Sequence, residues 1–248
     1  MISFIQEISN VLTPIGFKKR GNSFFASQGD GILLTVQAEK ERNVSYPGHP
    51  FYILGFSLMS MYSELLPQYF TGWGSIARYT MVNLIGEKAP FGQRETGYNE
   101  NGLIHVEQWE YSIEEQIEIL RKTGIDFLLG IQDQYTLIAA MIDLETAVYG
   151  EADLLDIFKY APFLYTGRYS EAEEIISRLL LQHETARENR LSHGIIPNED
   201  QAEREKKETE EFQNLRILVH KHNSKEIKEY LNQNYTTNEA LKIPRISL

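Results

Sequence analysis

Cysteine is absent from all 248 residues of the sequence. This absence excludes disulfide bonds, thiolate nucleophiles and cysteine-ligated zinc, and with them the usual mark of an exported, cross-linked domain. No uncharged apolar run approaches the roughly 20 residues that a membrane-spanning helix needs. Residues 1–16 have no basic segment, and Gln6 and Glu7 interrupt their apolar run, unlike a secretory leader. We therefore expect a cytoplasmic protein without a membrane partner.

Positive charge is also scarce. Lysine and arginine number 24 against 35 aspartates and glutamates, and the formal net charge is −11. A nucleic-acid-binding protein needs a basic face that displaces counterions from phosphates, so we expect no nucleic-acid partner. An acidic surface instead attracts basic partners, and the 14 tyrosines are of a type that suits protein interfaces.

Catalytic and metal-binding motifs are missing as well. The sequence has no Gly-x-Ser-x-Gly elbow and no Walker-type phosphate loop. His183 and Glu184 begin a pattern like that of zinc proteases, but Arg187 stands where the second histidine ligand belongs. Glycines within residues 71–77 imitate a dinucleotide fingerprint without the strand–helix–strand context that it requires. We therefore expect no catalytic residue, no metal and no cofactor, and we favour a non-enzymatic protein over an enzyme.

The first half of the chain has the pattern of an α+β fold. Residues 2–13 repeat apolar side chains at helical spacing, and Pro14 and Gly16 end that helix. Alternation typical of strands covers residues 17–27, 32–40, 51–62 and 103–111. Residues 28–31 contain Asp-Gly and predict a hairpin turn between the first two strands. We expect an antiparallel sheet of about four strands, with a short helix over 73–86 and a loop over 87–102.

The second half predicts helices only. Ser112 and Glu115 form a capping box that opens a helix ending at Gly124, and Ser170 and Glu173 form a second capping box. Further helices are expected over residues 134–149, 152–165 and 212–219, with a last one capped by Ser224. Residues 160–180 are similar to a single tetratricopeptide helix pair, and the charged run 198–211 predicts a solvated helix or a linker.

Strands followed by helices favour an α+β architecture. We divide the chain into an α+β sheet domain, residues 1–111, and an all-helical region, residues 112–248. The two parts either stand as separate units or pack together as one.

One basic motif stands out in this acidic chain, the stretch GFKKRGNSFF over Gly16–Phe25. On a strand, Lys18 and Arg20 lie on one face and Lys19 on the other. Two interpretations stay open: an edge strand whose cations discourage pairing with other chains, or a site for a small anion. The candidate ligand-binding residues are Lys18, Lys19, Arg20, His49, Trp73 and Arg78.

The pattern Leu12-x-x-x-Gly16-Phe17-Lys18-Lys19-x-Gly21-x-x-Phe24, followed by a hairpin and the segment 73–85, resembles a bacterial family known as a domain of unknown function. The resemblance covers residues 1–180. It implies a cytoplasmic α+β protein without an assigned reaction, of a general kind that includes immunity partners of secreted toxins. We expect a non-catalytic binding protein, in one version an immunity protein, that recognises a basic protein. The alternative is a small-anion-binding protein or enzyme with a cleft near the basic motif.

Overall fold

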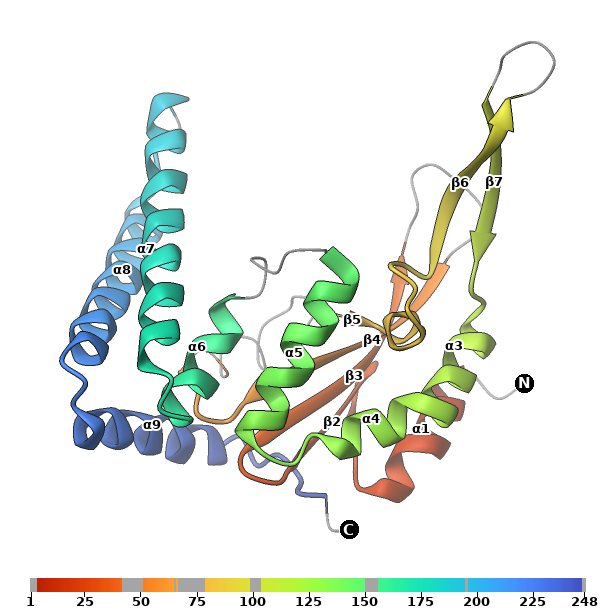
Figure 1. Ribbon diagram of the computed structural model, residues 1–248, viewed down its shortest axis with the longest axis horizontal. Coiled ribbons are helices and arrows are strands. Elements are labelled where there is room, and N and C mark those ends of the chain that lie inside the picture. Colours follow the sequence, from red (N-terminus) through yellow and green to blue (C-terminus); the bar gives the residue numbers. More distant parts are fainter. Residues whose placement is uncertain are drawn as a thin grey trace.

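The computed structural model describes residues 4–41, 51–64, 66, 79–98, 104–149, 156–194 and 196–246. Its order of elements confirms the expected α+β fold class. A helix comes first, a five-stranded antiparallel sheet follows, and the second half of the chain is helical (Figure 1). Among the described residues, no helix is both long enough and apolar enough to cross a membrane.

The N-terminal helix α1 (Phe4–Leu12) forms as predicted and buries Ile8 and Leu12. It passes into a short 3-10 helix, Thr13–Ile15, and the chain turns at Gly16. The φ of Gly16 is +102°, a left-handed conformation that glycine adopts without steric cost. This turn delivers the chain into the first strand.

The main sheet has the order β1-β2-β3-β4-β5, and each neighbouring pair is antiparallel. Its strands are β1 (Lys18–Arg20), β2 (Ser23–Gln28), β3 (Ile32–Glu41), β4 (Phe51–Ser60) and β5 (Tyr79–Thr80). The single strand expected over 17–27 is wrong, because the chain reverses after Arg20. Gly21, with φ +62°, occupies the first central position of that turn, where a positive φ suits a two-residue hairpin.

The hairpin predicted around residues 28–31 is confirmed, since Gln28 pairs with Ile32. The strand expected over residues 51–62 is present as β4, which lies between β3 and β5. The helix expected over 73–86 is corrected where the structure describes it. Tyr79–Thr80 is β5, and Met81–Ile85 forms the 3-10 helix η2.

A second sheet consists of β6 (Phe91–Tyr98) and β7 (Ile104–Glu110), which pair only with each other and project from the body (Figure 1). The loop expected over 87–102 is therefore wrong for residues 91–98. The strand expected over 103–111 exists, but it belongs to this ribbon and not to the main sheet. A ribbon that stands clear of the core does not need the alternation of apolar residues that marks a half-buried strand, so β6 left no such signal.

The helical half begins with the predicted capping box. The Ser112 N–H donates to Glu115 Oε2 at 2.8 Å, and the Glu115 N–H donates to Ser112 Oγ at 3.2 Å. The expected end at Gly124 is wrong: α3 (Ile113–Ile119) continues through a π-helical turn, Leu120–Gly124, into α4 (Ile125–Gly130). A Cβ at Gly124 would lie 3.1 Å from Leu120 Cδ1 and 3.3 Å from Met81 Sδ, so glycine permits close packing there and does not break the helix.

The remaining helices are α5 (Gln134–Tyr149), α6 (Asp156–Tyr165), α7 (Tyr169–Ser192), α8 (Glu199–His220) and α9 (Ser224–Glu239). The predicted helix pair is α6 and α7, joined by a turn in which Gly167 has φ +76°. Two predicted caps are wrong. The helix α7 starts at Tyr169 without a side-chain cap, and α9 is capped by Asn223 instead of Ser224. The charged run 198–211 is helical, as the first part of α8.

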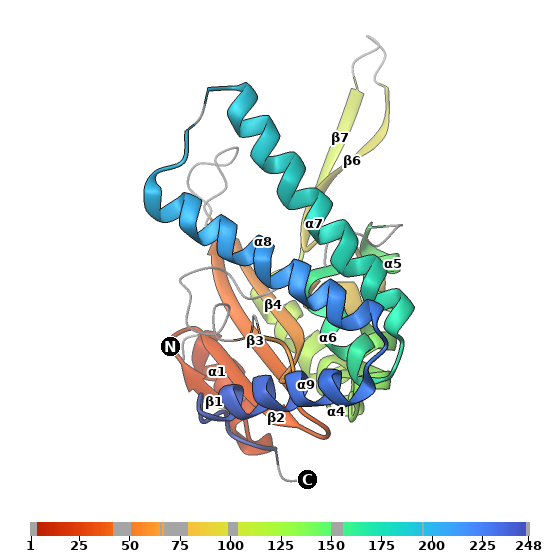
Figure 2. The same cartoon turned by 90° about the vertical axis from the view of Figure 1, so that its left-hand side faces the viewer.

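The sheet and the helical half are bound to each other by packing and by hydrogen bonds. One hydrophobic cluster joins the sheet to α1, α3, α4 and α5, and a second joins α6, α7, α8 and α9. Figures 1 and 2 both place α9 beside the end of the sheet where β2 turns into β3. There Asn238 Nδ2 donates to the carbonyls of Met61 at 2.7 Å and Ser63 at 2.8 Å. The chain end also returns to β2, since Ile246 N donates to Ser27 O at 2.8 Å.

Candidate functional site

The predicted basic site is only partly described. Lys18, Lys19 and Arg20 make up β1, which is the edge strand of the main sheet, and all three side chains are exposed. His49, Trp73 and Arg78 lie outside the described residues. The structure therefore brings three of the six candidates together on one sheet edge. The groove described below is lined by residues of α7, α8 and their connection.

A different cluster gathers at the opposite end of β2, where five elements meet. We call it the acidic tyrosine cluster, and it consists of Asp30, Tyr62, Tyr135, Tyr165 and Tyr235. Asp30 lies in the β2–β3 turn, Tyr62 follows β4, and the other three come from the start of α5, the end of α6 and the middle of α9.

The turn that carries Asp30 is fastened to the start of α5. The Asp30 N–H donates to Gln132 O at 3.0 Å, and Gln134 Nε2 donates to Asp30 O at 2.6 Å. Asp133 caps α5, because its Oδ1 accepts from the Thr136 N–H at 2.8 Å, and this bond is the main cause of the lowered pKa of Asp133. The backbone of Asp30 is thus fastened to the start of α5.

Tyrosines surround the Asp30 carboxylate. The Tyr62 hydroxyl donates to Asp30 Oδ1 at 3.2 Å, and the Tyr62 ring lies 4.5 Å from that of Tyr165 and 5.0 Å from that of Tyr235. Burial, followed by the bond to Tyr165 and the charge of Asp30, raises the pKa of Tyr62. The hydrogen bond to Asp30 is the main cause of the raised pKa of Tyr165. Both phenols therefore remain neutral donors to the carboxylate.

The cluster has a buried base and an open rim. Tyr62 is only 8% exposed, whereas Tyr165 is 38% and Tyr135 64% exposed. Exposed tyrosine rings over an ordered carboxylate can bind a cation, because the ring faces and the carboxylate all attract positive charge.

The segment of the chain that ends with α5 is acidic in sequence, although Glu145 is buried against Lys159. Residues 110–149 contain eight acidic and two basic side chains, a net charge of −6 out of −11 for the chain. The outer side of α5 also exposes apolar surface: Tyr135, Ala139 and Ile142 are exposed at helical spacing, and in Figure 1 this helix lies in front of the sheet. A weakly apolar stripe bordered by carboxylates thus extends from the cluster along α5.

Sequence reasoning missed this site. Asp30 carried only a turn signal, and its partners are spread from residue 62 to residue 235. The signal available was the abundance of tyrosine, which indicates an interface but not its position.

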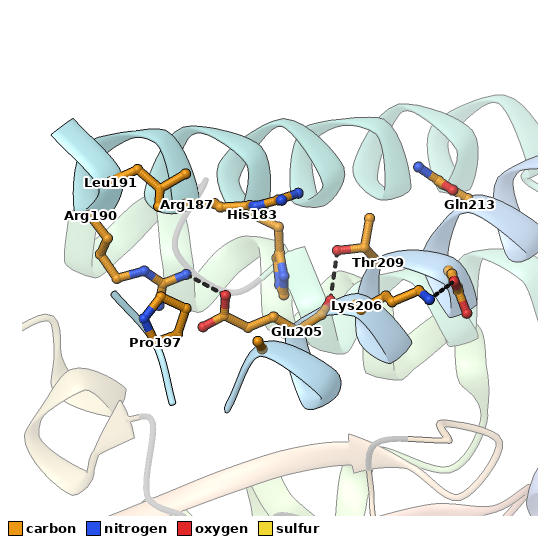
Figure 3. A pocket seen from close by; sticks show the side chains of 11 residues that line it. His183, Arg187, Arg190, Leu191, Pro197, Glu205, Lys206, Thr209 and Gln213 are labelled. Carbon is orange, nitrogen blue, oxygen red and sulfur yellow. Dashed lines mark hydrogen bonds and ion pairs between the residues drawn. The ribbon is translucent and has the colours of Figure 1, made fainter. Parts of the chain in front are cut away.

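A second feature is a groove of about 580 Å³ between the last turns of α7 and the first turns of α8 (Figure 3). Its lining includes His183, Arg187, Arg190, Leu191, Pro197, Ala202, Glu205, Lys206 and Glu210. Arg190 Nη2 crosses the groove to Glu205 Oε2 at 2.8 Å, and Lys206 Nζ lies 3.8 Å from Glu210 Oε1 on the same helix. The groove is thus lined by charged and apolar side chains together.

A third feature is a half-buried carboxyl group, Glu64, after β4. The phenols of Tyr230 and Tyr160 lie near this carboxyl group and act to lower its pKa, whereas Glu211 of α8 lies close enough to repel it. Burial is the main cause of its raised pKa. Among the described residues no group of three metal-ligating side chains occurs, so this carboxyl group has no metal site around it there.

No family model, no curated protein and no solved structure matches the chain. The resemblance of the Leu12–Phe24 pattern to a domain of unknown function therefore stays an expectation. Function is inferred from the chemistry of the described residues, of which the acidic tyrosine cluster offers the most specific surface for a partner.

Proposed function

We propose that the protein is a non-catalytic binding protein that recognises a basic protein partner through the acidic tyrosine cluster and the outer side of α5. The observation that carries this proposal is the Asp30 carboxylate, which accepts from the buried Tyr62 hydroxyl and lies near the exposed Tyr165, whose neighbour is the exposed Tyr135. A lysine or arginine side chain of the partner would meet ring faces and a carboxylate at once.

The cluster is ordered before binding. The contact between Tyr62 and Tyr165 and the bonds from the α5 start fix the rings and the turn, so less side-chain freedom is lost on association. Tyrosine is also frequent among the residues that dominate binding energy in interfaces.

Charge supports the same partner class. The net charge of −11 of the chain attracts a basic surface and speeds encounter at low salt. Ile142 and Ala139 add the apolar contact that the centre of an interface needs. A basic toxin bound by its immunity protein would be one instance of such a pair.

The test is capture of partners from native cytoplasm by the immobilised protein, at low and high salt. We expect a basic protein that is retained at low salt, is released at high salt, and is lost by the variant Asp30→Asn/Tyr135→Ala. The matched control is Lys18→Gln/Lys19→Gln on the opposite sheet edge, which should retain the partner. Capture that responds neither to salt nor to the first variant would contradict the proposal, and loss only in the control would favour an anionic ligand at β1.

A further inference from the structure

We propose that the groove between α7 and α8 binds an amphipathic anion, a small molecule with a carboxylate or phosphate head and an apolar body. The head would contact Arg187, and the body would lie against Leu191, Pro197 and Ala202. The groove is built from helices other than those of the acidic tyrosine cluster, so this inference does not depend on the proposed function.

The groove exists because the two helices separate toward their connecting turn. Near the body they are in contact, since His220 Nδ1 lies 2.9 Å from Glu173 Oε1 and the His183 ring lies 5.7 Å from that of Phe212. Figure 2 shows α7 and α8 diverging beyond this point. The resulting volume of about 580 Å³ is within the range of about 300–1,000 Å³ that is usual for small-molecule sites.

The charges of the groove select an anion. Both of its carboxylates already have cationic partners, Glu205 with Arg190 and Glu210 with Lys206. Arg187 also lines the groove, and within the described part of the chain it has no ion pair. A guanidinium offers parallel N–H donors that match a carboxylate or phosphate. The lining thus carries an uncompensated positive charge in a chain whose net charge is −11.

The apolar part of the lining requires more than an inorganic ion. Leu191 is 52% exposed, and Pro197 of the connection and Ala202 of α8 line the same groove. Figure 3 shows Leu191 and Pro197 at the same end of the groove as Arg190. An apolar body bound there would remove this surface from water, which is favourable in proportion to its area.

The test is a calorimetric titration of the full chain with octanoate, with octyl phosphate as a second head group. We expect saturable binding of at least one of them. Arg187→Gln should weaken it about ten-fold, the effect of losing a charge-assisted hydrogen bond. Acetate, which lacks the apolar body, and octan-1-ol, which lacks the charge, should each bind at least about ten-fold more weakly than octanoate. Ala202→Leu, which fills the groove without removing charge, should weaken binding as well.

The matched control is Lys225→Gln, which removes a cation on α9 whose side chain is 86% exposed and should leave the affinity unchanged. Methyl resonances of Leu191 should shift with octanoate at the same midpoint as the heat signal. The inference is overturned by an absence of saturable binding for both anions, by equal affinity of octanoate and octan-1-ol, or by equal affinity of the wild type and Arg187→Gln. Leu191 resonances that stay in place during saturable binding would also overturn it.

Discussion

Lys159 Nζ of α6 lies 2.8 Å from Glu145 Oε2 of α5, and the two side chains are only 7% and 0% exposed. Burial costs such a pair the hydration of two charges, and the attraction between the charges offsets part of that cost. Removal of one partner leaves the other charge buried without its main compensation. The pair therefore constrains how α5 and α6 can pack.

Lys159→Met should lower the free energy of unfolding by about 3–5 kcal/mol, because Glu145 then keeps a buried charge. The double variant Glu145→Leu/Lys159→Met should recover most of that loss, since an apolar pair of similar volume is tolerated. Urea unfolding measures both. The control is Lys122→Met, whose pair with Glu118 at 3.2 Å is exposed and should change stability by less than about 1 kcal/mol. Equal effects of the two single variants would contradict this account.

Gly29 occupies the tightest position of the β2–β3 turn. Its φ is +50°, and a Cβ built there would lie 1.8 Å from Gln132 O, a backbone atom that cannot move aside. Gly29→Ala should therefore destabilise the protein by more than the roughly 1–2 kcal/mol expected from left-handed backbone alone. Gly21→Ala separates the two effects, because Gly21 has φ +62° and nothing within 4 Å of its Cβ position. The melting temperature should fall from the wild type to Gly21→Ala and further to Gly29→Ala. A higher melting temperature for Gly29→Ala than for Gly21→Ala would exclude the clash.

Gln116 of α3 takes the place of a neighbouring strand beside the part of β4 that does not pair with β5. It accepts from the Leu54 N–H at 2.8 Å and donates to the carbonyls of Tyr52 at 2.9 Å and Tyr111 at 3.0 Å. Gln116→Leu leaves buried backbone groups unpaired, at about 1–3 kcal/mol for each such group. Chemical denaturation should show a loss of at least about 2 kcal/mol. The control is Glu114→Leu, two positions away and exposed, which should change the free energy of unfolding little.

The sequence predicted those parts of the fold that depend on local patterns. The helix at residues 134–149, the capping box at Ser112 and the hairpin at 28–31 each follow from neighbouring residues, and all three are present. The errors arose where contacts between distant parts of the chain determine the secondary structure. Gly124 continues a helix because Leu120 and Met81 pack against it, and β6 is a strand because β7 pairs with it.

The position of the candidate site could not be predicted from the sequence. The net charge and the tyrosine content indicated a surface for a basic partner. However, the contact between Asp30 and Tyr62 spans 32 positions, and the Tyr62 and Tyr235 rings are further apart in sequence still. Only the pairing of β2 with β3 and the docking of α5 and α9 bring these residues together. The basic motif, in contrast, was visible because its three cations are adjacent in sequence.

The Glu64 carboxyl should make stability depend on pH. Burial raises its pKa in the folded state above the ordinary value of 4.5, so the folded state retains a proton that the unfolded chain releases. The wild type should therefore lose stability as pH rises from about 4.5 through the folded pKa, because the unfolded state binds fewer protons there. Glu64→Gln keeps the shape and an acceptor for Tyr160 and Tyr230 but cannot ionise. Its melting temperature should exceed that of the wild type at pH 7.5, and the difference should shrink toward pH 4.

The variant Tyr230→Phe tests the same pH dependence in a second way. The Tyr230 phenol near the carboxyl group acts to lower the pKa of Glu64, so its removal should raise that pKa further and extend the pH range over which stability falls. Tyr230→Phe in the Glu64→Gln background should lack this extension, since no carboxylate remains to be stabilised. Melting temperatures measured from pH 4 to pH 8 for the four proteins form a closed cycle. Parallel pH profiles for wild type and Glu64→Gln would show that the carboxyl ionises equally well in both states.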